Sequence, residues 1–334
     1  MRLLPGNNVF QTKTLLRALI AILLLLFSAC ATSPKPSQHT DLHRIYSLSP
    51  GSSLISTHAP ILRVENGDEE YNQIGTVEAY IDDKNREKIK IDTSQATFYG
   101  ETETFQGQYG SYTNLIYRVH FTRVPLSAIP FSLTYGRNVG LFIIVTLNED
   151  EKPVLVTTVH TCGCYVAFVP TNHMIENAYR KDWPKLKQRV FGETLPARIQ
   201  LDSDTDRIIV DIRNRSHRIH EISVASSEKL SIDRQNKANL APIKDLRQIP
   251  LGDSTVSMFQ NQGPRKGYVK GSSKPFEALL MSWWAFDPFI GVDKDYGDPE
   301  KTGTIFYTSL KPWNRKASNM WPFTDFLEFW GWSL

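Results

Sequence analysis

The sequence lacks the short patterns that mark several familiar classes of protein. It contains no HExxH, GxSxG, Walker A or GxGxxG pattern and no CxxCH for attachment of c-type haem. No pair of carboxylates stands out as a general acid and base. These absences favour a protein that is not an enzyme, and they leave an enzymatic role open.

An excess of basic residues is also missing once the first residues are set aside. Residues 1–29 contain three basic residues, Arg2, Lys13 and Arg17, and no acidic residue, so the remaining 35 Lys and Arg balance 35 Asp and Glu. A nucleic-acid-binding protein would show a basic excess or stripe. We therefore expect no nucleic acid as a partner, and the hydrophobic content of 41% is that of a globular protein.

Long apolar runs are absent too, because the longest, Ala18 to Phe27, falls short of the roughly 20 residues that span a bilayer. With a basic flank before it and small residues after it, this run is typical of a secretory signal. Its last residues, LFSAC, resemble the lipobox of bacterial lipoprotein precursors. The alternative is an ordinary secretory signal that ends near a cysteine.

The resemblance to lipoprotein precursors implies a membrane anchor. Residues 1–29 would be a signal peptide, and Cys30 would become the acylated first residue of the mature chain. Ala31, where retention in the inner membrane usually requires Asp, implies an outer-membrane lipoprotein facing the periplasm. The polar segment 30–59, rich in Ser and Pro, would be the lipidated tether.

Strand-like text begins near Pro60, with short alternating segments separated by polar turns. Residues 139–147 are almost continuously apolar, as in a central strand, and a short polar turn joins them to the next apolar run as a hairpin. In NLIYRVHFTRV, Leu115 and Tyr117 share one face, and His120 on the other is predicted to be a surface or cross-strand residue. We expect an α+β, β-rich fold, a mostly antiparallel sheet or sandwich, in one domain over 60–334, with a subdivision near residue 195 as an alternative.

A few short helices complete this prediction. Asn172 can cap a helix that begins at His173, residues 184–192 can form another turn, and Pro322 can begin a terminal helix. Six of the seven tryptophans follow Leu279, and packing against the sheet is favoured over a membrane-interface belt. The acidic run DKDYGD is interpreted as a solvated turn, because a calcium loop would need a Glu where Thr304 stands.

Two of the three cysteines lie one residue apart in VHTCGCYVAFVPTNHM. If the strand continues through them, His160, Cys162 and Cys164 project to the same side. The predicted helix could fold His173 back beside the sulfur atoms. Thiolate and imidazole are ligands for zinc, and soft sulfur ligands suit copper, so these four residues form a candidate Zn or Cu site.

A redox interpretation uses the same two cysteines. With Cys30 acylated, Cys162 and Cys164 are the only thiols left to pair in an oxidising compartment. A disulfide across one residue would be strained and easily reduced, and flanking histidines could lower a thiol pKa. The third interpretation treats the pair as structural, either as a disulfide or as inert buried thiols.

The sequence therefore predicts a lipid-anchored binding or structural protein whose HTCGC segment holds zinc or copper. The alternatives are a thiol–disulfide redox protein that uses Cys162 and Cys164, and a scaffold in which the pair only packs. The membrane is the expected partner through Cys30, and the sequence names no protein partner or substrate.

Overall fold

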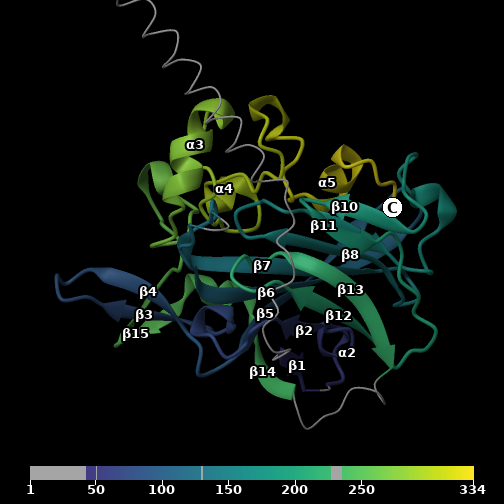
Figure 1. Ribbon diagram of the computed structural model, residues 1–334, viewed down its shortest axis with the longest axis horizontal. Helices are drawn as coiled ribbons and strands as arrows, with labels where there is room; N and C mark the ends of the chain where they lie inside the picture. The colour runs from purple at the N-terminus through teal and green to yellow at the C-terminus, as the bar shows by residue number, and fades with distance from the viewer. Residues whose placement is uncertain (1–42, 50, 129–130, 227–234) are drawn as a thin grey trace, which may run out of the picture.

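The computed structural model describes residues 43–49, 51–128, 131–226 and 235–334. The signal segment, the lipobox and Cys30 lie outside these residues, so their assignment stays a prediction. As predicted, the fold is rich in strands with a few short helices (Figure 1). Among the described residues, no helix has both the length and the apolar character needed to cross a membrane.

The strands, in chain order, are β1 (Arg44–Leu48), β2 (Ile61–Val64), β3 (Thr76–Ile81), β4 (Glu87–Asp92), β5 (Thr97–Gln106), β6 (Ser111–Val124), β7 (Gly136–Leu147), β8 (Pro153–His160), β9 (Ala167–Pro170), β10 (Lys187–Val190), β11 (Glu193–Pro196), β12 (Asp206–Ile212), β13 (Ile219–Ser226), β14 (Gln235–Pro242), β15 (Ile249–Leu251) and β16 (Ser254–Val256). The α-helices are α2 (Leu54–Thr57), α3 (Pro275–Ala285), α4 (Pro299–Thr302) and α5 (Phe323–Phe329). Single 3-10 turns are η1 (Glu70–Asn72), η2 (Glu176–Ala178), η5 (Ile243–Arg247), η6 (Gly263–Arg265) and η7 (Pro312–Asn314).

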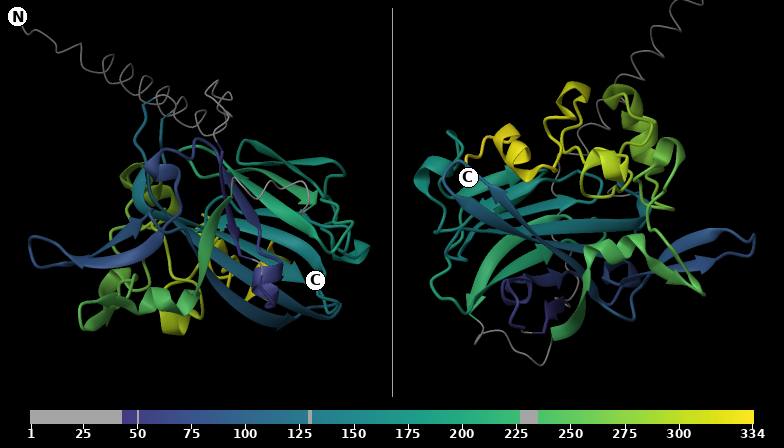
Figure 2. Two further views of the ribbon diagram at one scale, coloured as in Figure 1. Left: turned by 90° about the horizontal axis from the view of Figure 1, so that it is seen from below. Right: turned by 180° about the vertical axis from the view of Figure 1, so that it is seen from behind.

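One ten-stranded sheet organises the molecule, in the order β13-β12-β2-β1-β14-β5-β6-β7-β8-β9. Neighbouring strands are antiparallel except for three parallel pairs, β12 with β2, β1 with β14, and β14 with β5. The predicted hairpin is confirmed, because β7 pairs with β8 from Leu141 opposite His160 to Leu147 opposite Pro153. The β3–β4 hairpin projects from the body in all three views (Figures 1 and 2).

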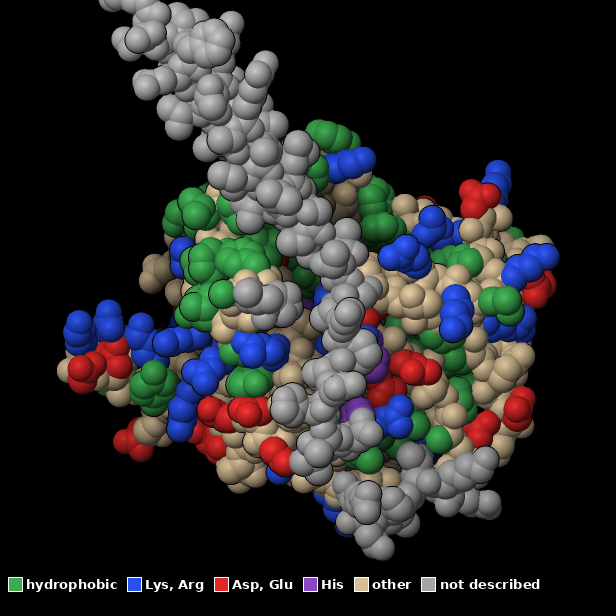
Figure 3. Space-filling view, viewed as in Figure 1, with side chains coloured by type: hydrophobic (Ala, Val, Ile, Leu, Met, Phe, Trp, Pro, Cys, Tyr) green, Lys and Arg blue, Asp and Glu red, His purple; other side chains and the backbone are tan. Residues whose placement is uncertain are grey.

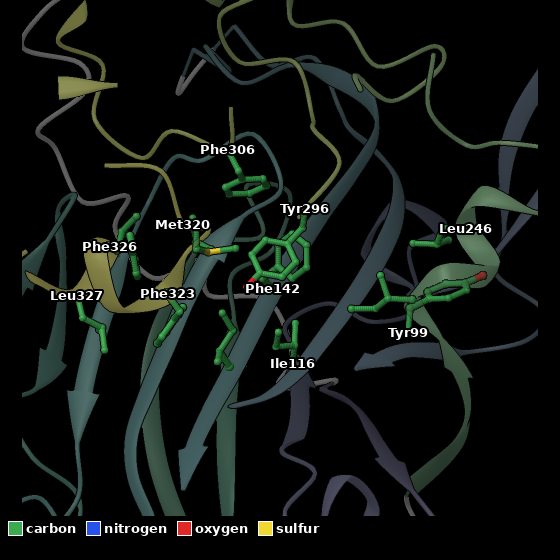
Figure 4. Close-up of a cluster of buried hydrophobic side chains, with 14 of the residues drawn as sticks. Tyr99, Ile116, Phe142, Leu246, Tyr296, Phe306, Met320, Phe323, Phe326 and Leu327 are labelled. Atoms are coloured by element: carbon green, nitrogen blue, oxygen red, sulfur yellow. The ribbon is translucent and has the colours of Figure 1, made fainter. Parts of the chain in front are cut away.

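Two apolar clusters pack against the two faces of the central strands. Alternation along β6 and β7 places Leu115 and Ile143 in one cluster and Ile116 and Phe142 in the other, so these strands are buried on both faces. The first cluster also holds side chains from β2 and β12, far along the strand order, so the sheet curves back over itself. The second cluster joins the sheet to the C-terminal segments (Figure 4).

The predicted terminal helix is confirmed as α5. Phe326 is fully buried and its ring centroid lies 5.6 Å from that of Phe168 on β9, while Trp332 packs at 4.7 Å from Trp183. The aromatic tail therefore clamps the chain end onto the sheet, as predicted for this part of the tail. Trp283, Trp284 and Trp313 are exposed instead, so packing does not account for them.

Other local predictions were wrong. The segment after Asn172 contains only the turn η2, and residues 187–190 form the strand β10, which pairs with β11. His120, predicted to be a surface or cross-strand residue, is not at the surface: it is fully buried opposite Gly140 of β7 and accepts a hydrogen bond of 2.9 Å from Arg118. Residues 44–48 of the predicted tether form β1 within the sheet, so the folded body already includes residues before Pro60.

Candidate functional site, a buried thiol pair

The two cysteines lie in a tight turn rather than in a strand. β8 ends at His160, whose carbonyl oxygen accepts a hydrogen bond of 2.7 Å from the amide of Gly163 and whose amide donates one of 2.9 Å to the carbonyl of Cys164. Gly163 has φ +89, and the carbonyl oxygen of Tyr307 occupies the space that a Cβ would need. The expectation of a continuing strand was therefore wrong.

This turn brings the two sulfur atoms together. Both cysteines are free thiols, Cys162 is buried, and Cys164 is half-buried. The two side chains are close enough to interact, and this interaction lowers the pKa of Cys162 and raises the pKa of Cys164. The two thiols are therefore brought together by a turn centred on a glycine, and not by a shared face of a strand as predicted.

The histidines predicted to join them do not converge on the sulfurs. Nε2 of His160 donates a hydrogen bond of 3.0 Å to the carbonyl oxygen of His217, and burial together with the charge of Lys274 holds the pKa of His160 well below its usual value. His173 follows Thr171, which pairs with Val154 at the other end of β8, about 20 Å along the strand. Among the described residues, no group of three or more His, Cys, Asp or Glu has an arrangement suited to a metal ion.

Four charged residues surround the thiols instead, and the sequence analysis did not assign them to the site. Lys274 and Glu277 belong to the start of α3, and Asp293 and Lys294 belong to the run DKDYGD. All four are at most 5% exposed. The interpretation of that run as a solvated turn was wrong, because its first four residues are buried, and Asp293 and Lys294 lie against the turn that holds the cysteines.

Hydrogen bonds attach Asp293 and Lys294 firmly to the cysteine turn. The carboxylate of Asp293 accepts bonds from the hydroxyls of Thr161 and Ser272, the latter at 2.7 Å. The amide of Lys294 donates to the carbonyl of Thr161 at 2.8 Å, and its ammonium group donates to the carbonyl of Cys162 at 2.6 Å. The fold thus places a carboxylate and an ammonium group beside the thiols at fixed positions.

The charges favour a thiolate at Cys162. Burial alone would raise its pKa, but the hydrogen bond from Cys164 and the positive charge of Lys274 lower it to about 6. Cys164 keeps the shared proton, and its pKa is raised by that hydrogen bond to Cys162 and by burial. Burial would lower the pKa of Lys274, but the negative charges of Cys162 and Asp293 raise it well above the usual value.

Glu277 is the second titratable carboxylate of the cluster. Burial raises its pKa to about 7, against the opposing effect of Lys274. Its Oε2 atom is buried and has no hydrogen-bond partner among the described residues. Gly291, at φ +76, lies against this carboxylate and has no room for a Cβ there. Burial without a hydrogen bond to this oxygen thus favours the protonated form of Glu277.

The arrangement balances charge when Asp293 and one further group, Cys162 or Glu277, are ionised, and the lower pKa belongs to Cys162. The two lysines, Lys274 and Lys294, are buried, and Asp293 supplies one negative charge beside them, because both of its oxygens accept hydrogen bonds as a carboxylate. A thiolate at Cys162 supplies the second negative charge. Two sulfurs in contact with one of them ionised are the starting point for disulfide exchange. The same two sulfurs offer a metal ion only two ligands, beside two positive charges.

Comparison with known proteins identified no relative. No protein-family model matches the chain, and no curated protein or solved structure is significantly similar to it.

Proposed function

We propose that this chain is a lipid-anchored, periplasm-facing thiol–disulfide protein whose redox pair is Cys162 and Cys164. The observation that carries the proposal is the contact between the two sulfurs beside the buried Lys274. The lipobox-like segment and the acylation of Cys30 supply the anchoring part of the proposal, which rests on the sequence alone.

The proposed step is a two-electron exchange with the disulfide of a second protein or of a small thiol compound. Cys164, the more exposed sulfur, attacks as a thiolate after its proton moves to Cys162, and one partner thiolate leaves. The Cys162 sulfur then loses the proton to that leaving thiolate and attacks the Cys164 sulfur, which releases the second partner thiolate. The pair loses two electrons, and the partner disulfide gains them.

The surrounding charges imply an oxidising couple. Formation of the disulfide removes the negative charge of Cys162 that Lys274 stabilises, so the reduced state is stabilised relative to the oxidised state. We therefore expect a reduction potential above about −300 mV, the range below which stable structural disulfides fall.

Thiol trapping of the full chain after equilibration in glutathione redox buffers tests the proposal. We expect a reversible transition that accounts for two thiols, and Cys164→Ser should abolish it without loss of the folded state. Thiols that stay reduced in every buffer would overturn the redox function in favour of the scaffold interpretation. Stoichiometric zinc or copper that is lost in Cys162→Ser would instead support the metal hypothesis made from the sequence.

A further inference from the structure

The helix α3 has an unusual distribution of side chains. The residues that it buries are Glu277 and Ala285, whereas its exposed residues include Leu279, Trp283 and Trp284. Leu279 and Trp283 have the i, i+4 spacing of one helix face, and Phe286 is the C-cap residue that follows α3; they are 73%, 62% and 77% exposed. Helices of globular proteins normally turn such a face inward, so this face lacks its partner in the structure.

A second exposed tryptophan lies on the neighbouring loop. Trp313 in η7 is 77% exposed, and Arg315, two residues later, donates hydrogen bonds to the carbonyl oxygens of Ala285 and Phe286 at the end of α3. We call the set Leu279, Trp283, Trp284, Phe286 and Trp313 the tryptophan face. Figure 3 shows hydrophobic side chains gathered over α3 on this side of the molecule.

Within the two segments that carry the tryptophan face, the exposed charge has one sign. In the segment 274–291 both acidic residues, Glu277 and Asp287, are buried. The segment 309–317 has no acidic residue, and its Lys311 and Lys316 are exposed. An apolar face rich in tryptophan and flanked by exposed lysines matches the border of an anionic bilayer, where tryptophan rings lie at the level of the headgroups.

The length of the predicted tether also favours a bilayer as the partner of the tryptophan face. Twelve residues separate Cys30 from the first described residue, His43, and such a segment reaches about 45 Å at most. A body of this size has a radius of gyration of about 19 Å. A chain anchored at Cys30 therefore cannot move farther from the bilayer than about its own diameter.

We infer that the tryptophan face lies in the headgroup region of the membrane that holds the anchor, with Lys311 and Lys316 against anionic phospholipid. This inference rests on the proposed lipid attachment at Cys30. It gives the body a fixed orientation, in which the outer face of α3 is in the membrane and its inner face, with Lys274 and Glu277, is against the thiols.

Fluorescence quenching by brominated phospholipids tests the inference, because bromine in the acyl chains quenches only tryptophans that enter the bilayer. The acylated full chain would be reconstituted in vesicles of phosphatidylethanolamine and phosphatidylglycerol that contain the brominated lipid. We expect strong quenching, which should fall at least about twofold in the triple variant Trp283→Ser, Trp284→Ser, Trp313→Ser. Leu186→Ser is the matched control, since Leu186 is 84% exposed and lies next to β10, far from α3 in Figure 1.

Tryptophans that the aqueous quencher acrylamide reaches and the brominated lipid does not would overturn the inference. Self-association that depends on the tryptophan face, without lipid quenching, would assign the face to a second copy of the chain and would overturn it as well. Mass spectrometry of Cys30 in the same sample shows whether the anchor is present, and so distinguishes a missing anchor from a tryptophan face that does not bind lipid. If Cys30 carries no acyl chain, loss of vesicle binding in the triple variant of that chain still tests the face by itself.

Discussion

The ammonium group of Lys294 lies 2.6 Å from the carbonyl oxygen of Cys162 and is fully buried with it. The cation is held by the backbone of the same turn that positions the two sulfurs. A change in the ionisation of the thiols therefore acts on a buried charge, where electrostatic interactions are stronger than at the surface.

Removal of the other buried cation should raise the pKa of Cys162. In Lys274→Met the side chain keeps its length but loses its charge, and we expect the thiolate pKa to rise by about 1 to 3 units. The reduction potential should fall with it. Ultraviolet absorbance of the thiolate during a pH titration measures the pKa. Lys274→Arg should retain most of the low value, and Lys311→Met, which changes an exposed lysine, should leave it unaltered.

The stability of the reduced protein should depend on pH in a way that the oxidised protein does not show. The pKa of Cys162 in the folded protein, about 6, is lower than the ordinary thiol value of 9.0. The contribution of this thiolate to the free energy of unfolding is therefore complete above pH 9 and is lost as the pH falls toward 6. Glu277, with a pKa raised to about 7, works in the opposite direction, mainly below pH 7. Between pH 7 and 8.5 the free energy of unfolding should therefore rise by up to about 1.4 kcal/mol per pH unit.

Denaturant unfolding at several pH values measures this dependence. Cys162→Ser should remove the rise, and the oxidised wild-type protein, which has no thiolate at Cys162, should not show it. A reduced wild-type protein whose stability is flat from pH 7 to 8.5 would show that Cys162 has an ordinary pKa.

Gly163→Ala should disrupt the turn that holds the thiols. Alanine is strained at φ +89, and its Cβ would collide with the carbonyl oxygen of Tyr307, so we expect a loss of about 2 kcal/mol or more of unfolding free energy. Gly252→Ala is the matched control, because Gly252 also has a positive φ, +59, but has open space around it. Equal losses in the two variants would mean that backbone strain alone matters at Gly163.

Phe326→Ala should destabilise the C-terminal clamp. Its ring is fully buried against Phe168, and truncation of a buried Phe typically costs about 3–5 kcal/mol. Trp313→Ala, which changes an exposed aromatic residue, should alter the stability of the lipid-free protein by less than about 0.5 kcal/mol. Thermal unfolding of both variants in detergent-free buffer gives the comparison.

Periodicity alone predicted much of the central sheet. The alternation in β6 predicted a strand with one apolar face, and the unbroken apolar run of β7 predicted a strand buried on both faces. A polar turn between β7 and β8 predicted the hairpin that the two strands form. The same reasoning failed for the polar face of β6, where His120 was expected at the surface or across strands, because a polar residue is predicted to face solvent until a second layer is known. In the structure, the guanidinium carbon of Arg118 lies 5.0 Å from the ring centroid of Phe142 and 5.1 Å from that of Phe259. No local sequence pattern predicts these contacts.

Of the groups in the candidate site, the sequence predicted only the closeness of the two cysteine sulfurs. Their spacing and the glycine between them are local properties, so the closeness of Cys162 and Cys164 could be argued before the fold was known. Lys274 and Lys294 lie more than 100 residues away along the chain, within segments that look like ordinary polar loops. Their burial follows from strand and loop packing, and it could not be read from residue type.

The sequence by itself determined the β-rich fold class, the central hairpin and the terminal helix, because each depends on the spacing of apolar residues along a short stretch. Tertiary structure decided which charges surround the thiols and which face of α3 stays uncovered. The reason is physical, since a pKa and an exposed fraction depend on whatever the whole chain packs around a group, and neighbours in sequence supply only part of that environment.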